Sequence, residues 1–182
     1  MKVNNKLDEV VWFALSAPHR REMKAKSLLD SAHIENFIPM QYQAVGTAKG
    51  KERRLVPAIS NLLFAKSSKR KLQELKTGVP FLQYKVRPEG GRNVPIIVPD
   101  HQMEQFRAIC ETHNEHLVFL QPEEINLSEG TPVRILGGAF DGITGIFVKL
   151  TGKKEKRVVV LLEGVAAVAT AEISPDLIEV IE

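Results

Sequence analysis

Residues 130–148 read GTPVRILGGAFDGITGIFV and hold the pattern that decides the fold of the carboxyl-terminal part. Val133 and Ile135 alternate with Arg134, as in a strand that buries one face. A second apolar stretch begins at Ile143, after a turn rich in glycine, which accepts backbone conformations that other residues avoid. The segment therefore predicts a strand–turn–strand unit, and its defining residues are Val133, Arg134, Ile135, Gly138, Phe140, Gly142 and Gly145.

The glycines of this segment also occur in two other kinds of structure, a phosphate-binding loop and a simple hairpin. A phosphate-binding loop would lead from a strand into a helix and would contain Gly-Lys-Ser or Gly-Lys-Thr, and the segment has neither feature. A glycine-rich hairpin without a specific function fits the residues equally well, so the pattern alone leaves that alternative open.

The surrounding residues favour a small all-β barrel over residues 128–182, preceded by a linker at 112–127. Short β-rich stretches follow one another after short turns, without helical periodicity, which is typical of a small antiparallel barrel. The stretches are 131–136, 143–150, 157–162, 165–170 and a shorter one at 177–181.

Residues 8–111 predict a separate α+β domain, in which an antiparallel sheet is flanked by helices. The continuous apolar run at 10–15 indicates a strand buried on both faces. Helices are predicted at 20–32, from a Ser67 or Ser68 cap to Lys76, and from Asp100 to Cys110, where Met103, Phe106 and Ile109 share one face. Shorter strands are expected near 37–39, 42–45, 62–65, 81–86 and 96–98, with a polar loop at 46–51.

Composition and charge restrict the class of protein. The 182 residues are 43% hydrophobic, which excludes a mostly disordered chain, and no apolar run approaches the roughly 20 residues of a membrane span. The single cysteine, Cys110, cannot form an internal disulfide, so we expect a reducing compartment and a cytoplasmic protein. Residues 49–76 hold nine basic and two acidic side chains, which favours a polyanionic partner, although a solvated surface is the simpler alternative.

No catalytic or metal site is expected. Cys110, His113 and His116 have a spacing that resembles a metal site, but a structural zinc needs four nitrogen or sulfur ligands, and no second cysteine exists. No nucleophile lies in a recognisable Gly-x-Ser-x-Gly setting. We therefore expect a protein that is not an enzyme and that needs no cofactor.

Taken with the amino-terminal features, the glycine-containing unit resembles a known family. Residues 130–148 resemble the KOW motif of SH3-like barrels, which occurs in ribosomal proteins and in transcription elongation factors. The Trp12-Phe13 pair, the basic helix and Phe37-Ile38-Pro39 resemble the NGN domain of the NusG family. The chain is most similar to the specialised antiterminator paralogues of the RfaH and UpxY type, in which Gly138–Gly142 has near-identical counterparts.

This resemblance implies a monomeric transcription antitermination and elongation factor that suppresses pausing and termination. In the family, an apolar depression on the NGN domain binds the clamp helices of the largest RNA polymerase subunit, and the specialised paralogues serve polysaccharide-synthesis operons. Some of the positions that match this depression will be core residues of the domain. In this sequence they are Trp12, Leu55, Val56, Pro57, Ile59, Leu62 and Phe64.

The resemblance also implies contacts with nucleic acid and with a partner of the barrel. His19, Arg20, Arg21 and Lys24 match the surface that touches non-template DNA in the specialised paralogues. Lys69, Arg70 and Lys71 stand where those paralogues carry a hydroxyl motif, so charge would replace hydroxyl hydrogen bonds there. In the family, the barrel recruits a ribosomal protein or a termination factor. An RNA-binding or ribosome-associated module with a KOW barrel is the alternative, although residues 126–182 hold six basic and eight acidic side chains, which disfavours RNA.

Overall fold

The computed structural model describes residues 6–121, 130–150, 154, 156–162, 164–170 and 173–182. The chain forms two compact units, Met1–Pro39 with Ser60–Asp100 and Met40–Ile59 with His101–Glu182. This division differs from the predicted boundaries, since residues 40–59 and 101–111 group with the carboxyl-terminal strands. The predicted domains 8–111 and 128–182 stay a prediction, and the end of the predicted linker, residues 122–127, lies outside the described residues.

The first unit is built on an antiparallel sheet in the order β2-β5-β1-β6, with β9 also paired to β1. The central strand β1 buries Phe13, Ala14 and Leu15 in succession, so the predicted strand with two buried faces is confirmed. The strands are β1 (Val10–Ser16), β2 (Glu35–Phe37), β5 (Leu63–Ser68), β6 (Gln83–Tyr84) and β9 (Ile97–Val98).

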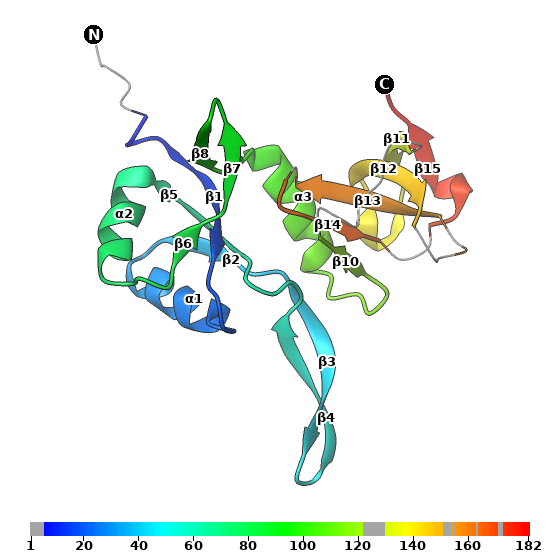
Figure 1. The fold of residues 1–182 in the computed structure, drawn as a ribbon. Coiled ribbons are helices and arrows are strands. Elements are labelled where there is room, and N and C mark those ends of the chain that lie inside the picture. The colour runs from blue at the N-terminus through cyan, green and yellow to red at the C-terminus, as the bar shows by residue number, and fades with distance from the viewer. Residues whose placement is uncertain (1–5, 122–129, 151–153, 155, 163, 171–172) are drawn as a thin grey trace. The chain divides into compact units, whose positions relative to one another are not determined.

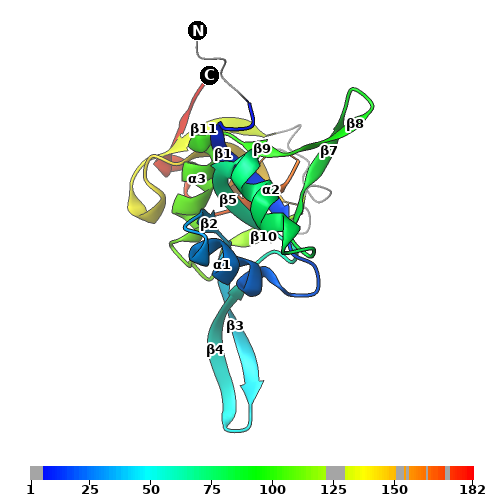
Figure 2. The ribbon, with the colours of Figure 1, turned by 90° about the vertical axis from the view of Figure 1, so that its left-hand side faces the viewer.

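Two helices, α1 (Glu22–Ser31) and α2 (Lys69–Thr77), lie on one face of this sheet (Figure 1, Figure 2). The predicted cap of α2 is confirmed, because the Ser68 hydroxyl accepts a hydrogen bond from the Lys71 backbone N–H at 3.2 Å. Helix α1 begins later than predicted, since His19 and Arg20 have left-handed φ angles of 62° and 57°, which a helix does not contain.

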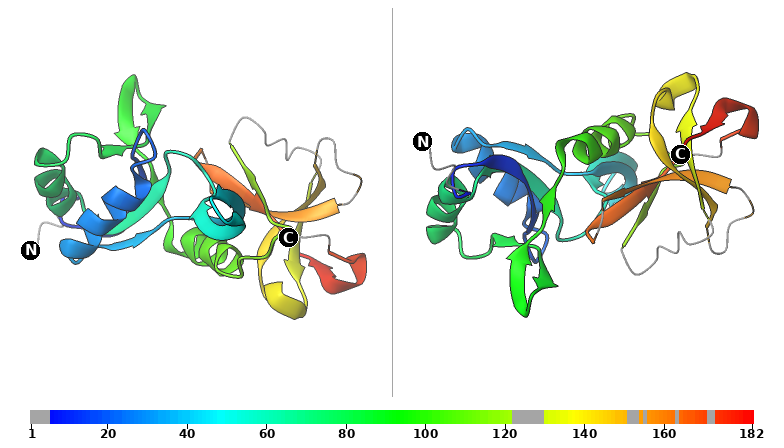
Figure 3. Two further views of the ribbon diagram at one scale, coloured as in Figure 1. Left: turned by 90° about the horizontal axis from the view of Figure 1, so that it is seen from below. Right: turned by 90° about the horizontal axis from the view of Figure 1, so that it is seen from above.

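A short hairpin of β7 (Val86–Glu89) and β8 (Arg92–Pro95) projects from the first unit (Figure 3). Gly90 and Gly91 form its turn with φ angles of 57° and 76°, which only glycine adopts without strain. The strand predicted at 81–86 is therefore split between the two-residue β6 and this hairpin.

The second unit contains a two-stranded ribbon of β3 (Met40–Thr47) and β4 (Gly50–Pro57). These strands pair with each other over their whole length and with no other described strand. The loop end of the ribbon stands clear of the other elements of its unit (Figure 1). The sequence predicted only a short strand and a polar loop here, because the alternation of side chains in a solvent-exposed ribbon is weak.

Helix α3 (Asp100–Cys110) buries Met103, Phe106 and Ile109, as their spacing predicted. Its Gln105 side chain accepts a hydrogen bond of 2.8 Å from the backbone N–H of Thr144 in the carboxyl-terminal sheet. No helix of the described residues combines the length and the apolar character that a bilayer crossing requires.

The carboxyl-terminal sheet is antiparallel, with the described strands in the order β10-β14-β13-β12-β11-β15. Figure 3 shows that these strands, from yellow to red, curve strongly instead of lying flat. Strand β10 lies within the predicted linker, and its apolar side chains explain why it joins the sheet. The strands are β10 (Val118–Leu120), β11 (Thr131–Ile135), β12 (Thr144–Lys149), β13 (Lys156–Leu162), β14 (Ala166–Ala169) and β15 (Ile178–Val180).

Candidate functional site

The turn before α1 presents a basic surface, which was predicted to contact nucleic acid. His19, Arg20, Arg21 and Lys24 are all exposed. The Arg21 guanidinium carbon lies 5.3 Å and the Lys24 amine 5.5 Å from the centroid of the Phe81 ring, so this ring orients both cations. The structure therefore brings these four predicted residues together.

The backbone of this turn is held in an unfavourable conformation. The left-handed φ angles of His19 and Arg20 cost on the order of 1–3 kcal/mol each, a kind of strain that concentrates at functional sites. Two residues after Arg20, the side chain of the buried Glu22 is held in place, because its Oε1 accepts a 2.8 Å hydrogen bond from the Asn61 backbone N–H. The turn is thus tied to the segment that leads into β5.

The second predicted basic group, Lys69, Arg70 and Lys71, begins α2. Arg70 donates to both carboxylate oxygens of Asp8, at 2.7 and 3.1 Å. This hydrogen bonding lowers the pKa of Asp8 and raises the pKa of Arg70. Lys71 donates to the His33 carbonyl oxygen at 3.5 Å, so two of the three cations already have partners within the unit.

Replacing Arg70 with glutamine is expected to raise the pKa of Asp8 towards its ordinary value, because the hydrogen bonds and the positive charge that lower it are lost. A lowered carboxyl pKa in the folded state contributes stability above the unfolded pKa, and this contribution is lost as the pH falls through the folded pKa. An NMR titration of the Asp8 side-chain carbon measures the change. Lys69→Gln is the control, and an equal shift in that variant would show that the Arg70 contact is not the cause.

The residues predicted to bind polymerase are mostly core residues. Trp12, Leu62 and Phe64 are buried in the first unit, and Ile59 is buried in the second. On β4, Leu55 is 39% exposed, while Val56 and Pro57 are half-buried. Of the predicted positions, only these three expose apolar surface to solvent.

Two side chains that the sequence does not single out, Tyr42 and Arg53, lie next to this apolar surface. Tyr42 is 50% exposed and lies directly opposite Leu55 in the register of the ribbon. The Arg53 guanidinium carbon lies 5.1 Å from the centroid of the Tyr42 ring. Residues 51–57 show no clear alternation of polar and apolar side chains, so only the strand pairing places Tyr42, Arg53 and Leu55 on one face.

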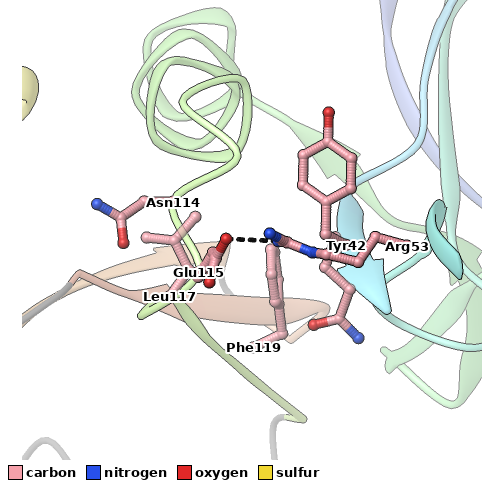
Figure 4. A pocket seen from close by; sticks show the side chains of 7 residues that line it. Tyr42, Arg53, Asn114, Glu115, Leu117 and Phe119 are labelled. Carbon is pink, nitrogen blue, oxygen red and sulfur yellow. Dashed lines mark ion pairs between the residues drawn. The ribbon is translucent and has the colours of Figure 1, made fainter. Parts of the chain in front are cut away.

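Tyr42 and Arg53 also line a polar pocket within the second unit (Figure 4). Its volume is about 380 Å³, and the segment after α3 supplies its other wall. There the Glu115 carboxylate forms an ion pair with the Arg53 guanidinium, shown as a dashed line in Figure 4. The lining residues are Gln41, Tyr42, Arg53, Asn114, Glu115, Leu117 and Phe119.

The glycine-containing unit of the barrel has the conformation that its sequence predicted. Val133 and Ile135 are buried, and Arg134 points to solvent, where it donates to Glu179 at 3.2 Å. Phe140 is buried in a short 3-10 helix, Gly138–Phe140.

The glycines of this unit have two different roles. Gly138 and Gly142 have positive φ angles of 74° and 78°, as a tight turn requires. Gly145 instead lies inside β12, where a Cβ atom would come within 2.6 Å of the Val159 carbonyl oxygen. It is needed for close packing and not for a turn.

The described residues contain no group of three or more histidine, cysteine or acidic side chains that could hold a metal. Cys110 is buried, and this burial raises the pKa of its thiol, so it stays protonated in the core. His113 packs instead against Tyr42, with the two rings edge to face at 6.0 Å.

Comparisons with known proteins identify the family. Residues 10–107, more than half of the chain, match the family model described as transcription termination factor nusG. A solved structure of NusG from Thermotoga maritima, reported for its domain interaction, is similar over 96% of this chain and 98% of its own, with 17% identity and a TM-score of 0.49. No curated protein matches. The predicted fold class is confirmed: an NGN domain of the α+β class followed by a small KOW-like β domain. The chain belongs to the NusG family of transcription termination and antitermination factors.

Proposed function

We propose that this protein is a specialised NusG paralogue of the RfaH and UpxY type. NusG family proteins are transcription factors that interact with RNA polymerase and are not enzymes. In this proposal, the protein binds the clamp helices of the largest polymerase subunit and suppresses pausing and termination, in operons dedicated to polysaccharide synthesis.

The observation that carries the proposal is the exposed apolar surface at the base of the ribbon, formed on one face by Tyr42, Leu55 and Pro57, whereas Val56 lies on the other face. We name this surface the docking patch. Tyr42 and Leu55 are directly opposed and are both well exposed, although they are large apolar side chains. Aromatic and aliphatic anchors of this kind receive the apolar face of a partner helix.

This docking patch narrows the set of residues that the family resemblance suggested. Trp12, Ile59, Leu62 and Phe64 cannot anchor a partner directly, because their side chains are buried. They act through the fold, by holding the strands that precede and follow the ribbon. The basic turn of His19, Arg20, Arg21 and Lys24 provides a separate surface for non-template DNA, where cations fix the register through phosphates.

The mechanism follows from differential affinity. A bound factor shifts an equilibrium only by the difference between its affinities for the two states. The protein therefore suppresses pausing because it binds the closed clamp, which holds nucleic acid firmly, more tightly than the open one.

Leu55→Asp is expected to weaken binding to purified RNA polymerase by about tenfold or more, equivalent to about 1.4 kcal/mol, because a charge would be buried in an apolar contact. The measurement is a titration of labelled protein with polymerase. Leu177→Asp is a matched control, since Leu177 is 44% exposed and lies in the carboxyl-terminal unit outside the docking patch. The docking patch is misassigned if both folded variants bind as the unchanged protein does, or if both weaken equally.

Two further measurements address the remaining parts of the proposal. Mapping the protein on the genome together with polymerase separates a dedicated factor, found at a few loci, from a general one found at most transcribed genes. Analysis of the copurified partners tests the alternative function, because a ribosome-associated module would bring down ribosomal RNA without polymerase subunits.

A further inference from the structure

The ribbon of β3 and β4 has two faces of different charge. Side chains alternate between the faces of a strand, and the register places Lys51 opposite Gly46 and Arg53 opposite Ala44 on one of them. We name this pair of cations with its small opposed residues the cationic face. Because glycine and alanine reach little beyond the backbone, the two long cations are the most prominent groups there.

The opposite face is electrically neutral at the same level of the ribbon. Arg54 donates to the Glu52 carboxylate, with nitrogen–oxygen distances of 2.9 and 3.2 Å. Its neighbour across the ribbon is the uncharged Gln43. The ribbon therefore concentrates its positive charge on one side, although the sequence of β4 shows only a mixed run of charges.

The dimensions of the ribbon suit a duplex of the B form. Its strands of eight residues span about 27 Å, and the major groove, about 12 Å wide, admits a two-stranded ribbon. Lys51 and Arg53 lie about 7 Å apart along β4, so each can contact a different phosphate. In A-form RNA the major groove is too narrow for side chains to enter.

We propose that the cationic face of this ribbon binds double-stranded DNA in the major groove, with Lys51 and Arg53 on the phosphates that flank it. The residues of this surface belong to the second unit, whereas those of the basic turn before α1 belong to the first. The inference goes beyond the proposed function, because it does not need polymerase, although Tyr42 belongs to the docking patch and also contacts Arg53 of the cationic face.

Glu115 competes with DNA for one of the two cations. It forms an ion pair with Arg53, whose guanidinium also lies over the Tyr42 ring (Figure 4). The side chains of Arg53 and Glu115 are 56% and 62% exposed, so the pair is solvated and readily exchanged. A phosphate that takes the place of Glu115 finds Arg53 already oriented by Tyr42.

The test measures the binding of the full chain to a duplex DNA of about 20 base pairs by fluorescence anisotropy, over a series of salt concentrations. The Lys51→Gln, Arg53→Gln double variant is expected to bind at least about tenfold more weakly at low salt. The slope of log affinity against log salt should fall by about 1.8, since each lost phosphate contact contributes about 0.9. Glu115→Gln is expected to bind about threefold more tightly or better, and this gain should disappear when Arg53 is also replaced.

Control variants separate the cationic face from net charge and from other surfaces. Lys149→Gln with Lys156→Gln removes the same charge from opposed positions of the barrel and should leave the salt slope unchanged. Arg54→Gln tests the neutral face, and Arg20→Gln with Arg21→Gln tests the basic turn. The proposal is wrong if Lys51→Gln, Arg53→Gln keeps the full slope, if the barrel control loses as much, or if an RNA duplex of the same sequence binds equally well. If Leu55→Asp still weakens binding to polymerase as expected, the proposed function stays intact.

Discussion

Phe64→Ala is expected to destabilise the first unit by about 3–5 kcal/mol, because a fully buried aromatic side chain is removed from the sheet core. The Phe64 ring stacks on the Phe37 ring, with the ring centroids 6.4 Å apart. In the sheet, Phe64 lies opposite Ala14 of the central strand β1. The chain has a single tryptophan, Trp12, which is buried in the same sheet. Urea denaturation followed by tryptophan fluorescence therefore reports on the unit that contains the change.

Val10→Ala is the control for this variant, since Val10 lies on the same sheet and is 58% exposed. Its stability should change by less than about 0.5 kcal/mol. A Phe64→Ala protein of nearly normal stability that binds polymerase poorly would contradict the core assignment and support direct contact with the partner.

Gly145→Ala is expected to destabilise the carboxyl-terminal sheet by about 2–3 kcal/mol, because the added methyl group has no space. A Cβ atom there would lie 2.6 Å from the Val159 carbonyl oxygen and 2.8 Å from Cγ1 of Val158. The first of these atoms belongs to the backbone of β13, so strands β12 and β13 must move apart to accept it. Hydrogen exchange of the β12 and β13 amides measures the loss of protection.

Gly46→Ala is the matched control, because no atom lies within 4 Å of the position that its added methyl group would take, and its φ angle is not in the left-handed region. It should change stability by less than about 0.5 kcal/mol. Equal loss of protection in both variants would show that the effect of Gly145→Ala does not arise from close packing against β13.

The sequence was most informative where local pattern and local structure coincide. The alternation of Val133 and Ile135 predicted β11, and the cap at Ser67 or Ser68 predicted the start of α2. The helical spacing of Met103 and Phe106 predicted the buried face of α3. Each of these signals lies within a few residues of the structure that it specifies.

The candidate site was harder to predict, because it depends on pairing between distant residues. Leu55 and Leu62 are the same residue type in one apolar stretch, yet one is exposed and the other is buried. Tyr42 joins the docking patch only through its register with Leu55, and Arg53 meets Glu115 only through the tertiary fold. The residue types alone do not predict that Tyr42 lies beside Leu55 or that Arg53 contacts Glu115.

Strand β10 has a consequence for any attempt to isolate the barrel. Val118 pairs with Ala169 and Leu120 pairs with Ala167, so β10 covers one edge of β14. A fragment that begins at residue 128 would leave the N–H and C=O groups of β14 open on an edge of small apolar residues. Such an edge recruits a strand from another molecule, so the shortened fragment would tend to self-associate, whereas one that starts before Val118 would stay closed.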